Sequence, residues 1–524
     1  MPLSVPIIRK LPSNLLRDCA DLFELAWPLL REPHSALLDS GPVPAGPADL
    51  RQFSYMGWAP YQVLSAQGTQ LRLWKRRESG GRGHTRLLQG DPFEQLQILL
   101  QETRTEQAAD WIPFTSGAVG YLGYGLRERI EQVPRVKKDS PPQPDMVFCW
   151  YDRLLAWDHR TREAWLCVTP GQGSDPDAVF QELVSLLNIC RPLPEVRRYF
   201  SRSQRPEPRM AREDYRTMIT RCKELIAAGE IYQANLSHQF VFELPGRNLV
   251  ELYAALRTAH PAPFGAFLNY PGFSVLSLSP ERFLRVQGSR VETRPIKGTA
   301  ARGATNDEDR VRASQLLQST KDAAEHVMIV DLERNDLGRV CKPGSVRVER
   351  SAELESYATV HHLVSTIAGQ LREGTGPVDC LRATFPGGSI SGAPKVRAMQ
   401  IIEELEPLGR GLYTGSIGWI SGAGNMDFSI VIRTILAQGN KGYLHVGGGI
   451  VADSDPDAEY QETLHKAAAF LQVLGGEVSA LGSGGVPSVC RGEQCEAIFV
   501  ENRSPRRGVY PERMRRAPRD DDGA

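Results

Sequence analysis

The sequence predicts an α+β protein in which antiparallel β-sheets form a β-sandwich core that is covered by helices. Short strand-like segments, such as VFCWYDRLLAWD and GAFLNYPGFSVLSLSP, are joined by tight turns, which favours antiparallel pairing. Segments with apolar residues at helical spacing, such as DAAEHVMIVDLERNDL, alternate with these strands. The chain has 524 residues. A single hydrophobic core does not usually extend through a chain of this length, so we expect two or three domains or one large composite domain.

Composition divides the chain into two structured regions, a linker and a tail. Residues 1–195 are rich in strand-like segments, among them VFCWYDRLLAWD and EAWLCVTP. Residues 196–211 are charged, contain prolines and lack periodicity, which predicts a linker. Residues 212–475 alternate short strands with helices. Residues 476–524 turn to Gly, Ser, Pro and Arg and end in DDDGA, which predicts a disordered tail.

The second region opens with a predicted helix. DYRTMITRCKELIAAGEI carries apolar residues at helical spacing and stops at Gly229, a residue typical of helix ends. Further on, KVRAMQIIEELEPL also has helical periodicity, whereas GYLHVGGGIV reads as an amphipathic strand. Helices that cover one side of amphipathic antiparallel strands are the pattern of an α+β protein.

Charge and hydropathy exclude two classes of partner. The 62 basic and 62 acidic residues cancel, so we expect neither nucleic acid nor an anionic membrane as a partner. The start, MPLSVPIIRKLPSNLL, does not resemble a signal peptide, and no apolar run is long enough to span a bilayer. The nine cysteines are scattered and mostly lie in apolar segments, as in reduced cytosolic proteins. We therefore expect a cytoplasmic protein.

Two acidic pairs are candidates for a metal site. Asp322 and Glu325 are three residues apart on one predicted helix, and Glu459 and Glu462 have the same spacing on another. Residues at this spacing share a helix face, so each helix can present two carboxylates to one point. Opposed faces would make an all-oxygen site suited to Mg²⁺, with Lys466 four residues after Glu462 beside it. Alternatively, each pair is a solvated helix face with ordinary ion pairs.

Lys297 and Glu281 are candidates for proton transfer or nucleophilic attack. Lys297 lies in RPIKGTAARG beside an apolar residue and a turn, where desolvation would lower the pKa of its amine. Glu281, in VLSLSPERFL, ends an apolar strand, where a raised pKa would suit a general acid. The alternatives are an exposed turn lysine and a solvated strand-end glutamate.

Two glycine-rich turns could bind a carboxylate through backbone amides. FPGGSISGAPK has Lys395 close by, and HVGGGIVADSD follows Arg433 in sequence. Neither has the Gly-Lys-Ser/Thr spacing of a phosphate loop, which argues against nucleotide binding.

These segments together resemble the chorismate-utilising enzymes, a family that includes anthranilate, aminodeoxychorismate, isochorismate and salicylate synthases. The resemblance extends from about residue 10 to 475. Its densest matches are GEIYQANLS, SLSPERFL, RPIKGTAARG, EHVMIVDLERNDLGRV, HHLVSTIAG, FPGGSISGAPKVRAM, YTGSIGW and GGGIVADSDPDAEYQET. It implies the fold of anthranilate synthase component I and chorismate as the substrate.

The resemblance also implies roles for individual residues. Glu325 and Glu462 resemble the ligands of a Mg²⁺ that holds the ring carboxylate of chorismate, with Asp322 and Glu459 beside them. Glu281 resembles the acid that protonates the departing 4-hydroxyl. His362, in HHLVS, resembles the histidine near that leaving group, and Ser40, in LLDSG, resembles part of a tryptophan pocket. The implied cradle for the substrate carboxylates consists of Tyr413, Arg433, the amides of Gly447, Gly448 and Gly449, and Lys466.

Two positions separate the branches of this family. PIKGT around Lys297 resembles the aminodeoxychorismate synthases, whereas anthranilate synthases have a small residue there. Gln233, in IYQANLS, stands where isochorismate and salicylate synthases have a lysine that activates water. The resemblance therefore implies that Lys297 adds to C2 of chorismate as the 4-hydroxyl leaves, and that ammonia then attacks C4 and expels the lysine.

The implied source of ammonia is a separate subunit. The sequence lacks the Gly-x-Cys-x-Gly nucleophile elbow of a class I glutamine amidotransferase, so we expect this amidotransferase (component II) as a partner. A pyridoxal-phosphate enzyme, aminodeoxychorismate lyase, would act downstream on the way to 4-aminobenzoate and folate. Two alternatives stay open, namely component I of an anthranilate synthase and a catalytically silent homologue that binds tryptophan or regulates an amidotransferase.

Overall fold

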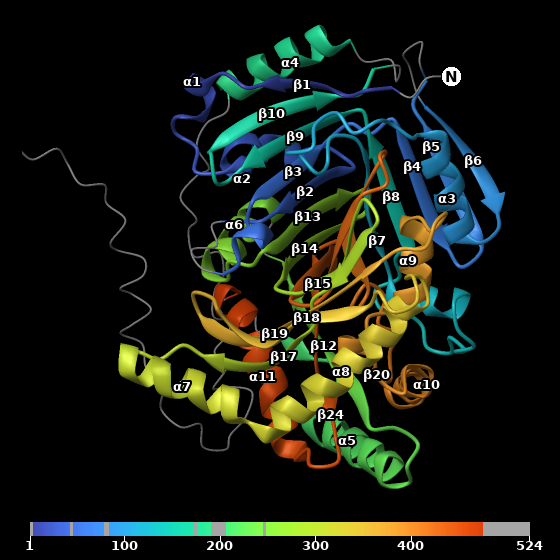
Figure 1. Ribbon diagram of the computed structural model, residues 1–524, viewed down its shortest axis with the longest axis vertical. Coiled ribbons are helices and arrows are strands. Elements are labelled where there is room, and N and C mark those ends of the chain that lie inside the picture. The colour runs from blue at the N-terminus through green and yellow to red at the C-terminus, as the bar shows by residue number, and fades with distance from the viewer. Residues whose placement is uncertain are drawn as a thin grey trace, which may run out of the picture. The chain divides into compact units, whose positions relative to one another are not determined.

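Two antiparallel sheets form the centre of the molecule in the computed structural model (Figure 1). The structure describes residues 4–41, 46–77, 83–170, 175–189, 206–244 and 248–474. The predicted tail, residues 476–524, and most of the predicted linker lie outside these ranges. Among the described residues each sheet contains 12 strands.

The first sheet is built from both predicted regions of the chain. Its spatial order is β1 (Ile7–Lys10), β10 (Glu163–Val168), β9 (Arg153–Asp158), β3 (Phe53–Gly57), β2 (Ser35–Asp39), β13 (Phe264–Tyr270), β14 (Phe273–Ser279), β23 (Thr434–Gln438), β24 (Lys441–Ile450), β12 (Gln233–Glu243) and β11 (Glu207–Pro208), with β20 (Gly392–Ala393) paired to β12. The regions join where β2 pairs with β13, with Asp39 opposite Gly265.

The second sheet joins the two regions in the same way, through β7 and β21. Its order is β17 (Ile296–Ala301), β19 (Val360–Gln370), β16 (Arg290–Thr293), β15 (Arg282–Gln287), β22 (Met426–Ile430), β21 (Ser416–Ser421), β7 (Gly117–Leu122), β8 (Met146–Tyr151), β4 (Gln62–Gln67), β5 (Gln70–Lys75) and β6 (His84–Gln89), with β18 (Arg347–Ser356) paired to β19. Each sheet therefore takes strands from before residue 190 and from after residue 205.

Apolar side chains from both sheets pack together into one buried cluster. Tyr55 and Leu268 enter it from the first sheet, and Val119, Tyr121 and Trp419 enter it from the second. Alternation of side chains along each strand places one face of each sheet in this cluster. The predicted α+β class with a β-sandwich core is confirmed.

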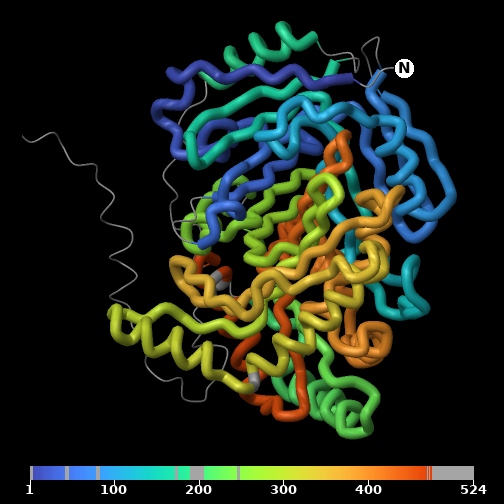
Figure 2. Tube along the Cα trace, viewed as in Figure 1, coloured from blue at the N-terminus to red at the C-terminus, as the bar shows by residue number. Residues whose placement is uncertain are grey.

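Helices cover the remaining faces of the sheets (Figures 1 and 2). The described α-helices are α1 (Ser13–Leu16), α2 (Leu22–Ala26), α3 (Pro92–Glu102), α4 (Pro176–Ile189), α5 (Arg212–Ala227), α6 (Leu249–Ala259), α7 (Asn306–Gln318), α8 (Thr320–Gly338), α9 (Pro377–Thr384), α10 (Lys395–Leu405) and α11 (Pro456–Val473). Short 3-10 helices are η1 (Trp27–Arg31), η2 (Ala48–Leu50), η3 (Tyr124–Arg129) and η4 (Gly388–Ile390). Helix α8 packs on β17 and β19, and α11 packs on β24 and α5.

Local signals in the sequence place several of these elements correctly. The predicted helix that stops at Gly229 is α5, and Gly229 has φ +79°, a backbone conformation in which glycine is favoured. Cys149, Cys167, Cys222, Cys341 and Cys380 are buried thiols outside any disulfide. None of the helices within the described ranges is long and apolar enough to cross a membrane.

A buried ion pair fixes strand β12, which carries Gln233 at its start. The guanidinium of Arg410 donates to both carboxylate oxygens of Glu406, at 2.9 and 2.7 Å. Glu406 also accepts from the amide and hydroxyl of Ser237 on β12, at 2.8 and 2.9 Å. Because the pair is almost fully buried, removal of either member leaves an uncompensated charge.

We expect Arg410→Ala to lower the free energy of unfolding by about 3–5 kcal/mol, because it leaves the carboxylate of Glu406 buried without its cationic partner. Urea denaturation measures this change. Arg334→Ala is the control, because Arg334 and Asp331 form an exposed pair whose loss costs about 0–1 kcal/mol. Equal losses in the two variants would show that the buried pair does not hold β12.

Candidate active site

The predicted acidic pairs lie on two helices, and a glycine run on β24 brings them together with other site residues. Glu459 and Glu462 belong to α11, and a methyl group on Gly448 would lie 3.1 Å from Glu459 Oε2 and 3.9 Å from Glu462 Oε1. Lys466 Nζ lies 2.6 Å from Glu462 Oε1 and donates to the carbonyl of Gly447 at 3.0 Å. The absence of side chains along this strand therefore lets α11 approach its backbone closely.

Glu325, from α8, reaches the same strand through Gln233. The amide of Gln233 donates to Glu325 Oε2 at 3.2 Å. A methyl group on Gly449 would lie 2.3 Å from Gln233 Nε2 and 3.4 Å from Lys297 Nζ. Gly448 and Gly449 thus separate the carboxylates of α11 from the amine of Lys297 and the Gln233–Glu325 pair.

Asp322 lies close to Gly298, the residue that follows Lys297. Its Cβ is 3.4 Å from the position that a methyl group on Gly298 would occupy. Gly298 has φ +84°, so a side chain there would be strained as well as crowded. The tight turn after Lys297 is therefore what allows α8 to pack against β17.

The amine of Lys297 is held in a setting that disfavours its charge. Lys297 is partly buried on β17. Burial lowers the pKa of this amine, and the charge of Lys466 lowers it further, whereas Glu325, Glu281 and Glu462 act in the opposite direction. A lowered pKa increases the fraction of neutral amine, which is the nucleophilic form.

Glu281 is a buried carboxyl at the junction of β14 and β15. It is 5% exposed, and its Oε1 accepts from the amide of Ile296 at 3.3 Å. Burial raises the pKa of this carboxyl, although the Ile296 amide and the charges of Lys297 and Arg433 favour its ionised form. A raised pKa keeps a proton available for donation.

His362 is a neutral imidazole close to the turn of β17. Its Nδ1 lies 2.8 Å from the hydroxyl of Thr299, and its ring also contacts the backbone of Gly298. Burial lowers the pKa of His362 to about 3, so the ring stays uncharged at neutral pH. It can act as a hydrogen-bonding group but not as a cation.

The remaining cradle residues lie around the same strands. Arg433 has φ +51° in the turn before β23, and its charge favours ionisation of Glu281. Tyr413 is buried and stacks on His445, with ring centroids 5.2 Å apart. Burial raises the pKa of Tyr413 to about 12, so its hydroxyl keeps its proton.

Two residues take part in other contacts. Ser40 donates through its hydroxyl to the carbonyl of Phe53 at 2.7 Å, and its part in a tryptophan pocket stays a prediction. Lys395, considered from the sequence as a carboxylate-binding group, is buried and forms an ion pair with Asp336. The amine of Lys395 also donates to the carbonyl of Thr384 at 3.0 Å, so these two contacts hold it in the interior of the protein.

Two buried polar residues near the site, His326 and Ser389, were not predicted from the sequence. His326 lies one turn from Asp322 on α8, contacts the backbone of Lys297, and its Nε2 is 2.5 Å from the hydroxyl of Ser365. Ser389 lies beside the carboxyl of Glu281. Thr299 lies in the PIKGT segment. No spacing rule predicted its contact with His362, because that contact depends on the pairing of β17 with β19.

The carboxylates near the glycine run are of a kind that suits a hard cation, which takes its remaining ligands from water and substrate. Within the described ranges no group of three or more His, Cys, Asp or Glu side chains is gathered closely enough to hold a metal alone. Mg²⁺ commonly takes one or two protein carboxylates and fills its octahedron with water and substrate oxygens. Glu325 from α8 and Glu462 from α11 are carboxylates of this kind.

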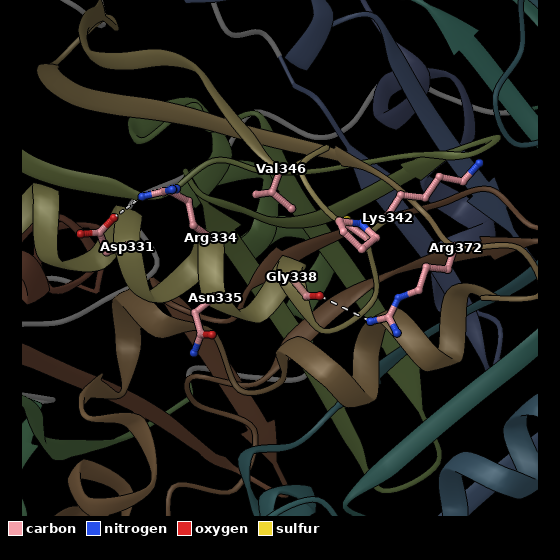
Figure 3. Close-up of a pocket in the computed structure, with 10 residues that line it drawn as sticks. Asp331, Arg334, Asn335, Gly338, Lys342, Val346 and Arg372 are labelled. Carbon is pink, nitrogen blue, oxygen red and sulfur yellow. Dashed lines mark hydrogen bonds and ion pairs between the residues drawn. The ribbon is translucent and has the colours of Figure 1, made fainter.

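A separate cavity of about 720 Å³ lies at the C-terminal end of α8 (Figure 3). Arg334, Lys342 and Arg372 line it, and Arg334 pairs with Asp331 at its edge. The guanidinium of Arg372 donates to the carbonyl of Gly338, near the end of the helix, at 3.4 Å. None of the site residues predicted from the sequence lines this cavity.

Comparisons with known proteins identify the family of the chain. A family model described as chorismate binding enzyme matches residues 48–472. Aminodeoxychorismate synthase component 1 of Bacillus subtilis is 40% identical over 392 residues, which are 74% of this chain and 83% of that protein. Anthranilate synthase component 1 of Cereibacter sphaeroides is 38% identical over 430 residues, 80% of this chain and 85% of that protein.

A solved structure shares the fold. The crystal structure of anthranilate synthase component I from Streptococcus pneumoniae has a TM-score of 0.70 and 31% sequence identity, covering 80% of this chain and 92% of that chain. The β-sandwich is thus the fold of a chorismate-utilising enzyme. The chain belongs to the family of chorismate binding enzymes.

We expect Gly449→Ala to lower chorismate turnover about 10- to 100-fold, because the new methyl group would collide with Gln233 and crowd the amine of Lys297. Steady-state kinetics measure the loss, and thermal unfolding shows whether the fold survives. Gly90→Ala is the control, since a methyl group there has no atom within 4 Å. Wild-type turnover in Gly449→Ala would mean that this strand does not position the amine.

Proposed function

We propose that the chain is the large subunit of an aminodeoxychorismate synthase. It converts chorismate and ammonia to 4-amino-4-deoxychorismate, a precursor of 4-aminobenzoate and folate. The observation that carries this proposal is the amine of Lys297, whose pKa is lowered by burial and which lies against Gly449, opposite the carboxylates of α11. The PIKGT segment around Lys297 also resembles this branch of the family.

Lys297 acts as a nucleophile in the proposed reaction. Its neutral Nζ forms a bond to C2 of chorismate, the ring double bonds shift, and the bond from C4 to the hydroxyl oxygen breaks. Ammonia then forms a bond to C4, the double bonds shift back, and the bond between C2 and Nζ breaks. The two displacements leave the nitrogen on the carbon that lost oxygen, and they split one difficult step into two easier ones.

Glu281 supplies the proton for the leaving group. Its raised pKa favours the protonated carboxyl, whose O–H bond breaks as the 4-hydroxyl departs as water. The carboxylate that remains is stabilised by the charge of Arg433 and by the amide of Ile296. His362, which is neutral, orients a hydroxyl in this region through its second ring nitrogen.

Glu325 and Glu462 would hold Mg²⁺, with Glu459 and Asp322 beside them. A bound Mg²⁺ would neutralise the ring carboxylate of chorismate and favour attack on the diene. Lys466 pairs with Glu462 at 2.6 Å, so it neutralises that carboxylate and can contact the same anion. Tyr413, Arg433 and the amides of β24 would hold the second substrate carboxylate.

The proposed partners follow from this chemistry. A glutamine amidotransferase subunit supplies ammonia, and aminodeoxychorismate lyase removes pyruvate from the product. Tryptophan at Ser40 and a cytoplasmic location remain predictions from the sequence. Because the C. sphaeroides relative is named anthranilate synthase component 1, we keep that activity as the second candidate.

Product analysis separates the two candidates. We expect purified protein with chorismate, Mg²⁺ and ammonium to give 4-aminobenzoate only after aminodeoxychorismate lyase is added. We expect Lys297→Ala to reduce this product at least about 100-fold, because the covalent route is lost. The control is Lys342→Ala, which alters the separate cavity at the end of α8. Fluorescent anthranilate formed without lyase would contradict the proposal.

A further inference from the structure

A second buried carboxyl, that of Glu333, lies behind Glu281. Glu333 is 7% exposed on α8, eight residues after Glu325 and therefore about two turns along the helix. Its Cγ would be 3.3 Å from a methyl group on Gly388, so the side chain is enclosed by η4. Neither the predicted site nor the proposed reaction uses this residue.

One hydroxyl determines how Glu333 is protonated. The Oγ1 of Thr293 lies 2.7 Å from the carbonyl oxygen of Phe283 and 2.8 Å from Glu333 Oε2. A threonine hydroxyl has a single proton, and a carbonyl oxygen can only accept. If Thr293 donates to Phe283, the contact with Glu333 needs a proton that comes from Glu333 itself.

The carbonyl oxygen of Phe283 is the expected acceptor of the hydrogen bond that the hydroxyl of Thr293 donates. The pairing of β15 with β22 shifts register between Arg282 and Leu284, which leaves Phe283 in a bulge. On its other side, the pairing of β15 with β16 begins only at Arg285. A buried carbonyl outside the strand ladders requires another donor, and Thr293 provides it.

The surrounding charges also favour a neutral Glu333. It faces Glu281 from the turn between β14 and β15, Asp336 from α8 and Lys395 from α10. The charge of Lys395 is already matched by Asp336, to which it is paired. An ionised Glu333 would therefore be a surplus negative charge in the interior, next to a second carboxyl.

We propose that Glu333 carries its proton in the working enzyme, and that this neutral carboxyl is a positioning residue which allows Glu281 to release its own proton. When the O–H bond of Glu281 breaks, a carboxylate forms beside Glu333. A neutral Glu333 does not oppose that charge, whereas an ionised one would make Glu281 a weaker acid. The effect on proton release rests on the proposed function, but the protonation of Glu333 does not.

The expected pH dependence follows from the direction of the shift. Burial, together with the carboxyls of Glu281 and Asp336, raises the pKa of Glu333 from 4.5 to about 8, against the opposing effects of Thr293 and Lys395. The folded state thus binds this proton more tightly than the unfolded chain. Its contribution to stability is complete below about pH 4.5 and is lost as the pH rises through about 8.

Infrared difference spectra test the protonation directly. We expect wild-type protein with ¹³C-labelled glutamate to show the C=O stretch of a protonated carboxyl that titrates near pH 8, and Glu333→Gln to lack it. The band should persist in Glu281→Gln. It should also persist in Glu292→Gln, because Arg282 and other arginines hold the pKa of buried Glu292 below its usual range. A wild-type spectrum without this band, or its loss in Glu281→Gln, would overturn the proposal.

Kinetics test the consequence for catalysis. With free ammonia held constant, the ratio of Glu333→Gln turnover to wild-type turnover should rise up to about tenfold between pH 7 and pH 9, as wild-type Glu333 ionises. The ratio cancels titrations that both proteins share. A flat ratio would contradict the role in proton release. Absence of amination in the wild-type protein would instead refute the proposed function and leave the spectroscopic result standing.

Discussion

An amine whose pKa is lowered although carboxylates surround it is the constraint on which this site depends. Coulomb attraction to Glu325 and Glu462 favours the ammonium form of Lys297, and two charges 4 Å apart interact by about 4 kcal/mol at an effective dielectric constant of 20. Desolvation opposes this attraction and is the larger effect, so the pKa is lowered. Pairing of Lys466 with Glu462 helps, because it offsets part of the negative charge and repels a second cation.

The sheets supply the geometry that this constraint requires. The glycines of β24 remove side chains between α11 and β17, and the Gly298 turn lets α8 approach from the other side. Glu281 is also buried, and burial outweighs the hydrogen bonds and cations that favour its ionised form, so the pKa values of both groups are shifted toward their neutral forms. One pKa unit corresponds to about 1.4 kcal/mol, and the stability that offsets these shifts comes from the large apolar core shared by both sheets.

Periodicity and motif spacing predicted the local structure. The contacts between residues that are distant in the sequence could not be predicted without the strand order. The helix that stops at Gly229 and the shared helix face of Asp322 and Glu325 follow from rules acting over a few residues. No such rule places Gly449 against Lys297, because their strands lie in different sheets. Lys395 illustrates the limit, since its glycine-rich surroundings resembled an anion site while its real partner, Asp336, is 59 residues away. The roles of the gathered residues remain predictions.

The measurement that tests this account most directly is the intact mass of the protein after incubation with chorismate and Mg²⁺ in the absence of ammonia. The amine of Lys297 should trap the substrate, giving a mass increase equal to chorismate less one water, which peptide mapping assigns to Lys297. Addition of ammonium should discharge the adduct. An unmodified protein under conditions in which ammonium supports turnover would contradict the account, because the amine would then take no covalent part.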